Sequence, residues 1–219
     1  CSYEEARGDQ CDKCGKLLEP NELINPKSKI SGTTPVEKES KHLYINLKKI
    51  EENNSLDPDL DTWIRANEDK WTHNAKTTTE AWIKEGLQPR CITRDLEWGV
   101  PVPAKELGLS KEYEKKVFYS WFDAPIGYIS ITADCKKDWE NWWKNPEETN
   151  LVQFMGKDNI PFHTLLFPAF CIGAKNNYTL MNEISVNEYI NYEGGKFSKS
   201  RNIGVFGDDA MDNGISADI

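Results

Sequence analysis

One short loop of this 219-residue sequence carries side chains suited to chemistry on phosphate groups. The segment Lys196–Ser200 reads Lys-Phe-Ser-Lys-Ser and directly follows two glycines. The ammonium groups of Lys196 and Lys199 can neutralise charge that develops on a leaving pyrophosphate, and the Ser198 hydroxyl adds a hydrogen-bond donor. The alternative interpretation is a solvated basic loop that binds no phosphate.

A second stretch carries the spacing of a zinc knuckle, in which two thiolates on a tight turn bind one metal ion. Cys11 and Cys14 flank Asp-Lys and are followed by glycine, and Cys1 lies ten residues upstream as a candidate third ligand. Residues 1–36 hold few apolar side chains, so we expect bound zinc to stabilise a segment that cannot build its own core. The alternative is a chance Cys-x-x-Cys pair in a loop.

The composition excludes several classes of protein. A hydrophobic share of 38% with eight Trp, eight Tyr and eight Phe is incompatible with a disordered or collagen-like chain. No run of 18 apolar residues and no secretory signal is visible, so we expect no membrane partner. The net charge of −9 argues against coating nucleic acid by bulk charge. Six scattered cysteines do not form a disulfide framework, which predicts a reducing compartment and a cytoplasmic protein.

The first half of the chain is predicted to contain one strand followed by two helices. The strand covers residues 42–47, and a strand-like piece recurs within residues 89–103. The first helix is predicted over residues 57–71, with Asp57 and Pro58 as its cap and first turn. The second is predicted over residues 77–85, closed by Gly86.

The second half alternates apolar runs with polar turns and helices, which is typical of an α/β fold with a parallel sheet. Three strands are predicted, over residues 117–122, over residues 151–155 and from residues 178–181 onward. One predicted helix ends near residue 133, and a second covers residues 161–170. In such sheets ligands bind beyond the carboxyl ends of strands. The loops at those ends are residues 121–125, 156–158 and 191–201.

Each candidate side chain in these loops also has a structural interpretation. Asp158, just past a strand, is placed to bind a ribose hydroxyl or to cap a helix. His163 at a helix start is as well explained by a structural role. Without further context, Trp121, Tyr128 and Phe167 are better explained as core aromatic residues.

Taken together, these motifs resemble one family, the methionyl-tRNA synthetases, which are class I aminoacyl-tRNA synthetases. The resemblance covers residues 1–219 with few gaps, and five stretches carry it: residues 3–15, 90–96, 118–129, 156–163 and 196–200. The block Trp-Phe-Asp-Ala-Pro-Ile-Gly-Tyr from Trp121 to Tyr128 is specific to methionine enzymes, whereas the Lys196–Ser200 pentapeptide is shared across class I.

The resemblance implies a domain organisation and a reaction. Residues 1–116 are expected to be a connective insertion with the zinc knuckle in about residues 1–36, and residues 117–219 the second half of a Rossmann-type catalytic domain. The implied enzyme is a ligase that joins methionine to ATP as methionyl-adenylate, releases pyrophosphate and transfers methionine to its tRNA. The implied cofactors are ATP, Mg²⁺ and structural Zn²⁺. The implied partners are methionine, ATP and methionine tRNA, with other synthetases or assembly factors as further candidates.

The resemblance also assigns roles to residues by position. The methionine pocket is expected to comprise Trp121, Ala124, Pro125, Tyr128, Phe162, His163 and Phe167, where aromatic faces hold the thioether and His163 or Tyr128 bonds its sulfur weakly. The ATP-binding residues are expected to be Gly156, Lys157, Asp158, Lys196, Ser198 and Lys199. Lys199, Lys196 and Arg94 are the implied catalytic residues, and Cys1, Cys11 and Cys14 the implied zinc ligands.

Two features depart from the family pattern. The His-Ile-Gly-His motif of the first Rossmann half is absent, since no two of the three histidines are three residues apart. We therefore expect this chain to hold half an active site, without the helical anticodon-binding domain. Ser28 and Ser31 stand where two-zinc relatives carry Cys, which places the chain in the one-zinc subgroup, with a fourth Cys expected three residues before Cys1.

Three other interpretations remain open. An isolated zinc-knuckle RNA-binding module is disfavoured by the acidic balance and the long α/β half. A catalytically dead subunit for assembly or regulation is disfavoured by intact Lys196, Lys199, Asp158 and His163. A class I synthetase for leucine, isoleucine, valine or cysteine is disfavoured by the block from Trp121 to Tyr128. Because apolar pockets discriminate modestly, homocysteine and leucine analogues are expected misactivated substrates.

Overall fold

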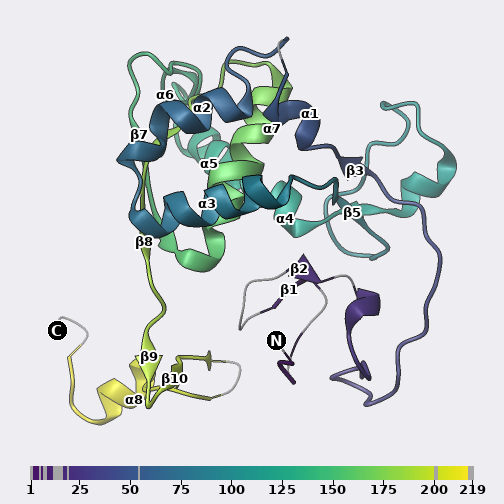
Figure 1. The fold of residues 1–219 in the computed structure, drawn as a ribbon, viewed down its shortest axis with the longest axis vertical. Coiled ribbons are helices and arrows are strands. Elements are labelled where there is room, and N and C mark those ends of the chain that lie inside the picture. The colour runs from purple at the N-terminus through teal and green to yellow at the C-terminus, as the bar shows by residue number, and fades with distance from the viewer. Residues whose placement is uncertain are drawn as a thin grey trace. The chain divides into compact units, whose positions relative to one another are not determined.

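The computed structural model describes residues 2–4, 6, 9–11, 17–18, 20–53, 55–199 and 202–216. It divides into two compact units, an N-terminal unit of residues 1–41 and a main unit of residues 42–219 (Figure 1). The predicted functional boundary near residue 116 is a different division of the chain, and it stays a prediction.

The N-terminal unit contains one short antiparallel ladder. Strand β1 (Asp9–Gln10) pairs with β2 (Leu17–Leu18), and a 3₁₀ turn, η1 (Pro20–Glu22), follows. Cys11, directly after β1, has a buried side chain, whereas Cys1 and Cys14 lie outside the described residues. Within the described part of the chain, no group of three or more His, Cys, Asp or Glu side chains could hold a metal ion.

Two further antiparallel pairs open the main unit. Strand β3 (Tyr44–Ile45) pairs with β4 (Arg90–Cys91), in agreement with the predicted strand 42–47. Strand β5 (Thr93–Arg94) pairs with β6 (Val117–Phe118).

The run 117–122 was expected to be a strand of the parallel sheet, and this prediction is wrong for most of its length. The strand stops at Phe118, pairs antiparallel with β5, and gives way to helix α4 (Ser120–Asp123). The ring of Phe118, at the end of the strand, lies 5.1 Å from the ring of Phe122 on α4. A short apolar run has no periodicity that separates strand from helix.

The parallel strands β7 (Leu151–Gly156) and β8 (Met181–Asn187) are the element that positions the candidate site. They are joined by the 3₁₀ turn η4 (Lys157–Asn159), the π-helical turn η5 (Phe162–Leu166) and helix α7 (Phe167–Ala174). The predicted strand–turn–helix–strand order is therefore confirmed here. Because Trp71 bridges Ile184 in parallel on the other side of β8, β8 is covered on both edges.

Helices from the first half pack against this unit (Figure 1). They are α1 (Lys48–Glu51), α2 (Leu60–Asn67) with the 3₁₀ turn η2 (Glu68–Lys70), and α3 (His73–Glu85). Their fully buried Leu60, Ile64 and Ala75 share one core with Leu165 of η5 and Met181 of β8. The helices of the first half and the parallel strands are thus one folded body.

The remaining elements follow the same chain order. After the 3₁₀ helix η3 (Lys111–Lys115), helices α5 (Ile126–Cys135) and α6 (Glu140–Trp143) precede β7. After β8 come the hairpin strands β9 (Asn191–Tyr192) and β10 (Gly195–Lys196), and then helix α8 (Gly207–Asp212). None of the described helices is long and apolar enough to span a bilayer.

The ends of α2 and α3 differ in part from expectation. Helix α3 ends at Gly86, as predicted, with φ of 93°, which glycine adopts without strain. The cap of α2 is Asp59, not the predicted Asp57: its carboxylate accepts the Thr62 N–H at 2.9 Å. These hydrogen bonds from Thr62 lower the pKa of the Asp59 carboxyl from its ordinary value.

This cap can be tested by substituting the two aspartates separately. Asp59→Ala should lower the free energy of unfolding by about 1 kcal/mol near neutral pH, because an N-terminal amide of α2 loses its acceptor. The exposed Asp57→Ala, as the matched control, should change it by less than about 0.5 kcal/mol. Both follow from urea unfolding curves.

The same curves have a pH signature. The pKa of Asp59 is lower in the folded chain than in the unfolded chain. Its contribution to the free energy of unfolding is therefore complete above the unfolded Asp pKa of about 3.9, and it is lost as the pH falls through the folded pKa. An equal loss from both substitutions, or a difference that persists in strong acid, would contradict this cap.

Candidate functional site

The first contact group is an aromatic stack that begins on α4. Trp121 meets Phe162 of the π-helical turn edge-on, with ring centroids 4.6 Å apart and planes at 87°. On its other side Trp121 stacks with Tyr119 at 5.5 Å and 24°. Two of the predicted pocket residues, 41 positions apart in the sequence, are thus in direct contact.

The second contact group joins α5 to the crossover after β7. The Tyr128 hydroxyl lies 2.9 Å from His163 Nε2, and the Tyr128 ring lies 5.9 Å from the ring of Phe167. His163 and Phe167 are buried, whereas Tyr128 is 44% exposed. The group therefore has a buried base, formed by His163 and Phe167, and a partly exposed tyrosine at its edge.

The protonation of His163 follows from its two partners. Its Nδ1 lies 2.9 Å from the backbone carbonyl oxygen of Asn159, which can only accept, so Nδ1 carries the proton. Burial lowers the pKa of His163 from its ordinary value, with the Asn159 bond opposing that shift. The neutral ring therefore offers Nε2 as an acceptor, and Tyr128 donates its hydroxyl proton to it.

This arrangement decides what the pair can offer to a ligand. Tyr128 has one hydroxyl proton, held by His163 Nε2 but near the accessible edge of the group. A ligand acceptor such as a thioether sulfur must compete with Nε2 for that proton. A ligand donor can instead bond to the Tyr128 oxygen while the His163 bond persists.

Ala124 and Pro125 lie between these two contact groups along the chain. Ala124 ends α4 and is exposed, and Pro125 precedes α5 and is buried. All seven predicted methionine-pocket residues therefore come from two short segments, residues 121–128 and 162–167, which pack ring against ring.

Arg94 joins the first contact group through a residue that the sequence analysis does not single out. Its guanidinium lies 3.7 Å from the ring centre of Tyr119, the ring that stacks with Trp121. Its Nη1 also donates to the Thr93 carbonyl oxygen at 2.9 Å. The only sequence signal for Tyr119 is its position two residues before Trp121.

The loop after β7 holds the three predicted nucleotide residues. A Cβ at Gly156 would lie 3.0 Å from the Asp158 carboxylate, so glycine lets that carboxylate fold back on the strand end. Asp158 is exposed. Lys157 Nζ lies 2.5 Å from Glu188 Oε2 and 4.6 Å from the centre of the Tyr189 ring.

Glu188 is the second residue at this site that sequence reasoning missed. It follows the end of β8, and its other oxygen accepts from the Asn74 amide at 3.0 Å. The hydrogen bonds from Lys157 and Asn74 lower the pKa of the Glu188 carboxyl from its ordinary value. The signal that could have found it is its position just beyond a parallel strand, where polar side chains of α/β sites gather.

The predicted phosphate loop is held by a hairpin. Between β9 and β10, Glu193 and Gly194 have φ of 48° and 79°, the pattern of a tight hairpin turn. The backbones of Ser198 and Ile203 then exchange hydrogen bonds of 2.9 and 3.0 Å, which close a small loop with exposed Lys199 at its start. The side chain of Lys196 and residue Ser200 lie outside what the structure describes.

Gly204 lies against the Phe197 ring at the end of this loop. At Gly204, with φ of 140°, a Cβ would lie 2.2 Å from the Phe197 ring, which also packs on Phe206 at 5.2 Å. The Phe197 ring therefore packs directly against the backbone of Gly204 and links the two ends of the loop that carries Lys199.

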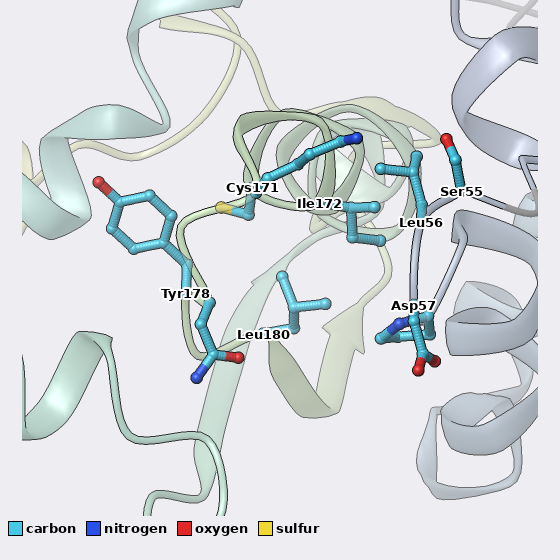
Figure 2. Close-up of a pocket in the computed structure, with 10 residues that line it drawn as sticks. Ser55, Leu56, Asp57, Cys171, Ile172, Tyr178 and Leu180 are labelled. Atoms are coloured by element: carbon cyan, nitrogen blue, oxygen red, sulfur yellow. The ribbon is translucent and has the colours of Figure 1, made fainter.

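A pocket of about 290 Å³ lies at the opposite end of the crossover (Figure 2). It is lined by the end of α7, the residues before β8 and the segment before α2: Ser55, Leu56, Asp57, Pro58, Cys171, Ile172, Lys175, Asn177, Tyr178 and Leu180. Burial raises the pKa of the Cys171 thiol to about 12, so this thiol stays protonated and is no nucleophile. No predicted site residue lines this pocket.

Comparison with known sequences gives one consistent result. Residues 1–219 match the family model described as tRNA synthetases class I (M). The chain is 54% identical to a protein named probable methionine–tRNA ligase, cytoplasmic, of Dictyostelium discoideum, covering 100% of this chain and 28% of that protein. It is 53% identical to the human cytoplasmic methionine–tRNA ligase, covering 100% of this chain and 23% of that protein. It is 50% identical to the cytoplasmic enzyme of Saccharomyces cerevisiae, covering 100% of this chain and 28% of that protein. The chain thus spans about a quarter of the length of these relatives.

Comparison with solved structures supports the fold. A Mycobacterium tuberculosis methionyl-tRNA synthetase in complex with methionyl-adenylate has a TM-score of 0.63 at 22% identity, covering 91% of this chain and 36% of that one. The structure of the same bacterium's enzyme in its free state has a TM-score of 0.56 at 22% identity, covering 83% and 34%.

The protonation of His163 can be measured directly. Nitrogen NMR should find a neutral ring protonated on Nδ1 near neutral pH, with a pKa below the ordinary value of about 6.5, because burial disfavours the charged form. Since the unfolded chain then binds the proton first, the free energy of unfolding should fall as pH drops below about 6.5. A ring protonated on Nε2, or a pKa above the ordinary value, would refute this assignment.

Proposed function

This chain belongs to the class I tRNA synthetases of the methionine type, and we propose that it supplies the methionine pocket and part of the ATP site of a methionine–tRNA ligase. The family expected from the five sequence stretches is confirmed, and the fold is the class I synthetase fold with a parallel α/β sheet. The observation that carries the proposal is the hydrogen-bonded Tyr128–His163 pair beside the Trp121–Phe162 contact, at the end of β7 that leads into the nucleotide loop.

The aromatic groups suit a flexible thioether. The faces and edges of Trp121, Phe162 and Phe167 offer polarisable contacts to the methyl group and sulfur, and Ala124 and Pro125 complete the wall. Tyr128, held by its bond to His163 Nε2, adds its ring to this wall, and its hydroxyl is a weak hydrogen-bond partner for the sulfur.

The weakness of this sulfur contact bears on specificity. Leucine, which has no sulfur, loses only a weak hydrogen bond and is therefore rejected mainly by shape. Homocysteine keeps a sulfur and lacks only the methyl group, a difference that apolar pockets resolve by about 10–200-fold. Misactivation of homocysteine is therefore the expected weakness of this pocket.

The loop after β7 would bind the nucleotide. The exposed Asp158 carboxylate accepts a ribose hydroxyl, and Gly156 lets the ribose approach the strand end. Lys157 exchanges its Glu188 partner for the α-phosphate.

The hairpin loop would bind the leaving group. Lys196, Ser198 and Lys199 hold the β- and γ-phosphates, and exposed Lys199 stabilises the charge that develops on pyrophosphate. Bound Mg²⁺ would supply further neutralisation of the phosphates. Arg94, whose guanidinium stacks on Tyr119, would bind near the methionine carboxylate or the adenylate.

The N-terminal unit would be the zinc-bearing part of an insertion that covers residues 1–116, with the second Rossmann half over residues 117–219. The β1–β2 ladder flanks the Cys-x-x-Cys segment, as a metal knuckle requires, and Cys11 is buried beside it. Cys1, Cys11 and Cys14 would hold Zn²⁺, which supplies folding energy rather than chemistry. The names of the relatives include the word cytoplasmic, which supports a cytoplasmic location for this chain.

The proposed function is tested by ATP–pyrophosphate exchange on the full-length gene product that contains this chain. Methionine, leucine, isoleucine, valine and cysteine are offered separately, and exchange with methionine alone is expected. Lys199→Ala, which removes the transition-state charge, should slow exchange by about 10²–10³-fold at unchanged methionine affinity. Exchange with another amino acid, or with none, would refute the proposal, the latter in favour of a catalytically dead subunit.

The methionine pocket gives a sharper prediction. Trp121→Ala should raise the KM for methionine by about 10²-fold and leave the KM for ATP within about threefold, because it removes the ring that contacts Phe162. Trp142→Ala is the matched control, since this tryptophan is 56% exposed on α6, and it should change neither constant. An unchanged methionine KM in Trp121→Ala would assign Trp121 to the core.

Zinc is tested by metal analysis of the same purified protein. One zinc per chain is expected, and Cys11→Ser should lose it together with the fold of the N-terminal unit. The exposed Cys135→Ser serves as the control and should keep its zinc. Equal zinc content in both variants would exclude Cys11 as a ligand.

A further inference from the structure

A buried pair of threonine hydroxyls lies directly behind the His163 turn, outside every role assigned so far. Thr79 on α3 and Thr164 on the π-helical turn η5 are 1% and 0% exposed, and their hydroxyl oxygens lie 2.8 Å apart. They are 85 positions apart in the sequence. We call Thr79 and Thr164 the hydroxyl pair.

The proton order in the hydroxyl pair is fixed by geometry. Thr164 donates its proton to the Ile160 carbonyl oxygen at 3.0 Å, so its own oxygen is left as the acceptor for Thr79. The single hydroxyl proton of Thr79 has two acceptors at 2.8 Å, the Thr164 oxygen and the Ala75 carbonyl oxygen, and is shared between them. Because both hydroxyls are buried, removing the Thr79 hydroxyl leaves the Thr164 oxygen without a donor.

The turn that carries Thr164 has an unusual winding. In η5 the Phe167 N–H bonds to the Phe162 carbonyl, five residues back, rather than four as in an α-helix. This winding is rare and inserts one residue into the helical register, which turns His163 and Thr164 toward different neighbours. Thr164 meets α3 through Thr79, while His163 meets α5 through Tyr128.

We propose that Thr79 is a positioning residue for methionine: through Thr164 it locks the π-helical turn and so aims His163 Nε2 at Tyr128. This inference rests on the proposed function, because it assigns the His163–Tyr128 pair to the methionine side chain. A slip of the turn toward α-helical winding rotates His163 away from Tyr128 and leaves the nucleotide loop before it in place. The expected effect is therefore on methionine and not on ATP.

The test uses ATP–pyrophosphate exchange by the full-length gene product. Thr79→Val keeps the shape of the side chain and removes the hydroxyl; it should raise the KM for methionine by about tenfold and leave the KM for ATP within about twofold. Thr79→Ser restores the donor and should return the methionine KM to within about twofold of wild type.

A matched control separates positioning from general destabilisation. Thr179 is also 1% exposed, and its hydroxyl donates to the Trp142 carbonyl oxygen at 2.7 Å rather than to a residue of η5. Thr179→Val should lower the free energy of unfolding about as much as Thr79→Val without separating the two KM values. If Thr79→Val does not fold, Thr79→Ala takes its place and must show the same separation.

The outcomes are distinct. Equal changes in both KM values, or a serine variant as impaired as the valine variant, overturn the positioning role of Thr79. A wild-type protein without methionine-dependent exchange overturns the proposed function instead. An active wild type whose methionine KM is unchanged in Thr79→Val overturns only this inference.

Discussion

The hydrogen bond from His163 Nδ1 to the Asn159 carbonyl oxygen is the constraint on which the candidate site depends. It fixes the tautomer of a buried, neutral imidazole and leaves Nε2 to orient the Tyr128 proton. Without that bond, Nε2 could carry the proton and donate it to the Tyr128 oxygen. The Tyr128 hydroxyl would then offer a ligand its proton instead of its oxygen. The two partners of His163 come from different elements, Asn159 from the turn after β7 and Tyr128 from the first turn of α5.

The architecture serves this constraint by bringing two distant segments to one strand end. Strand β7 delivers the nucleotide loop and then the π-helical turn, while α4 and α5 supply Trp121 and Tyr128 from the preceding segment. A row of contacts runs from Phe162 through Trp121 and Tyr119 to the guanidinium of Arg94 on β5. A side chain of the candidate site is thus supported by another ring or a backbone carbonyl rather than by a flexible loop.

Much of the fold could be predicted from the sequence because β7, its crossover and β8 follow local rules: apolar runs, a polar turn and a helix closed by turn residues. The antiparallel pairing of β6 could not, since Val117–Phe122 has no period that separates strand from helix. The pocket residues were predicted from a contiguous block and a resemblance, and their roles stay predictions. Two of their supports have only a weak local signal, Tyr119 from its position two residues before Trp121 and Glu188 from its position just beyond β8. The Thr79–Thr164 contact joins residues 85 positions apart, and nothing local in the sequence marks it.

Helix α3 touches this region twice. Asn74 near its start bonds Glu188, the partner of Lys157, and Thr79 bonds the turn that carries His163. These contacts are five residues apart, or about 7.5 Å along the helix axis. One helix therefore supports both the Lys157 loop and the His163 turn, and a displacement of α3 would shift the two together.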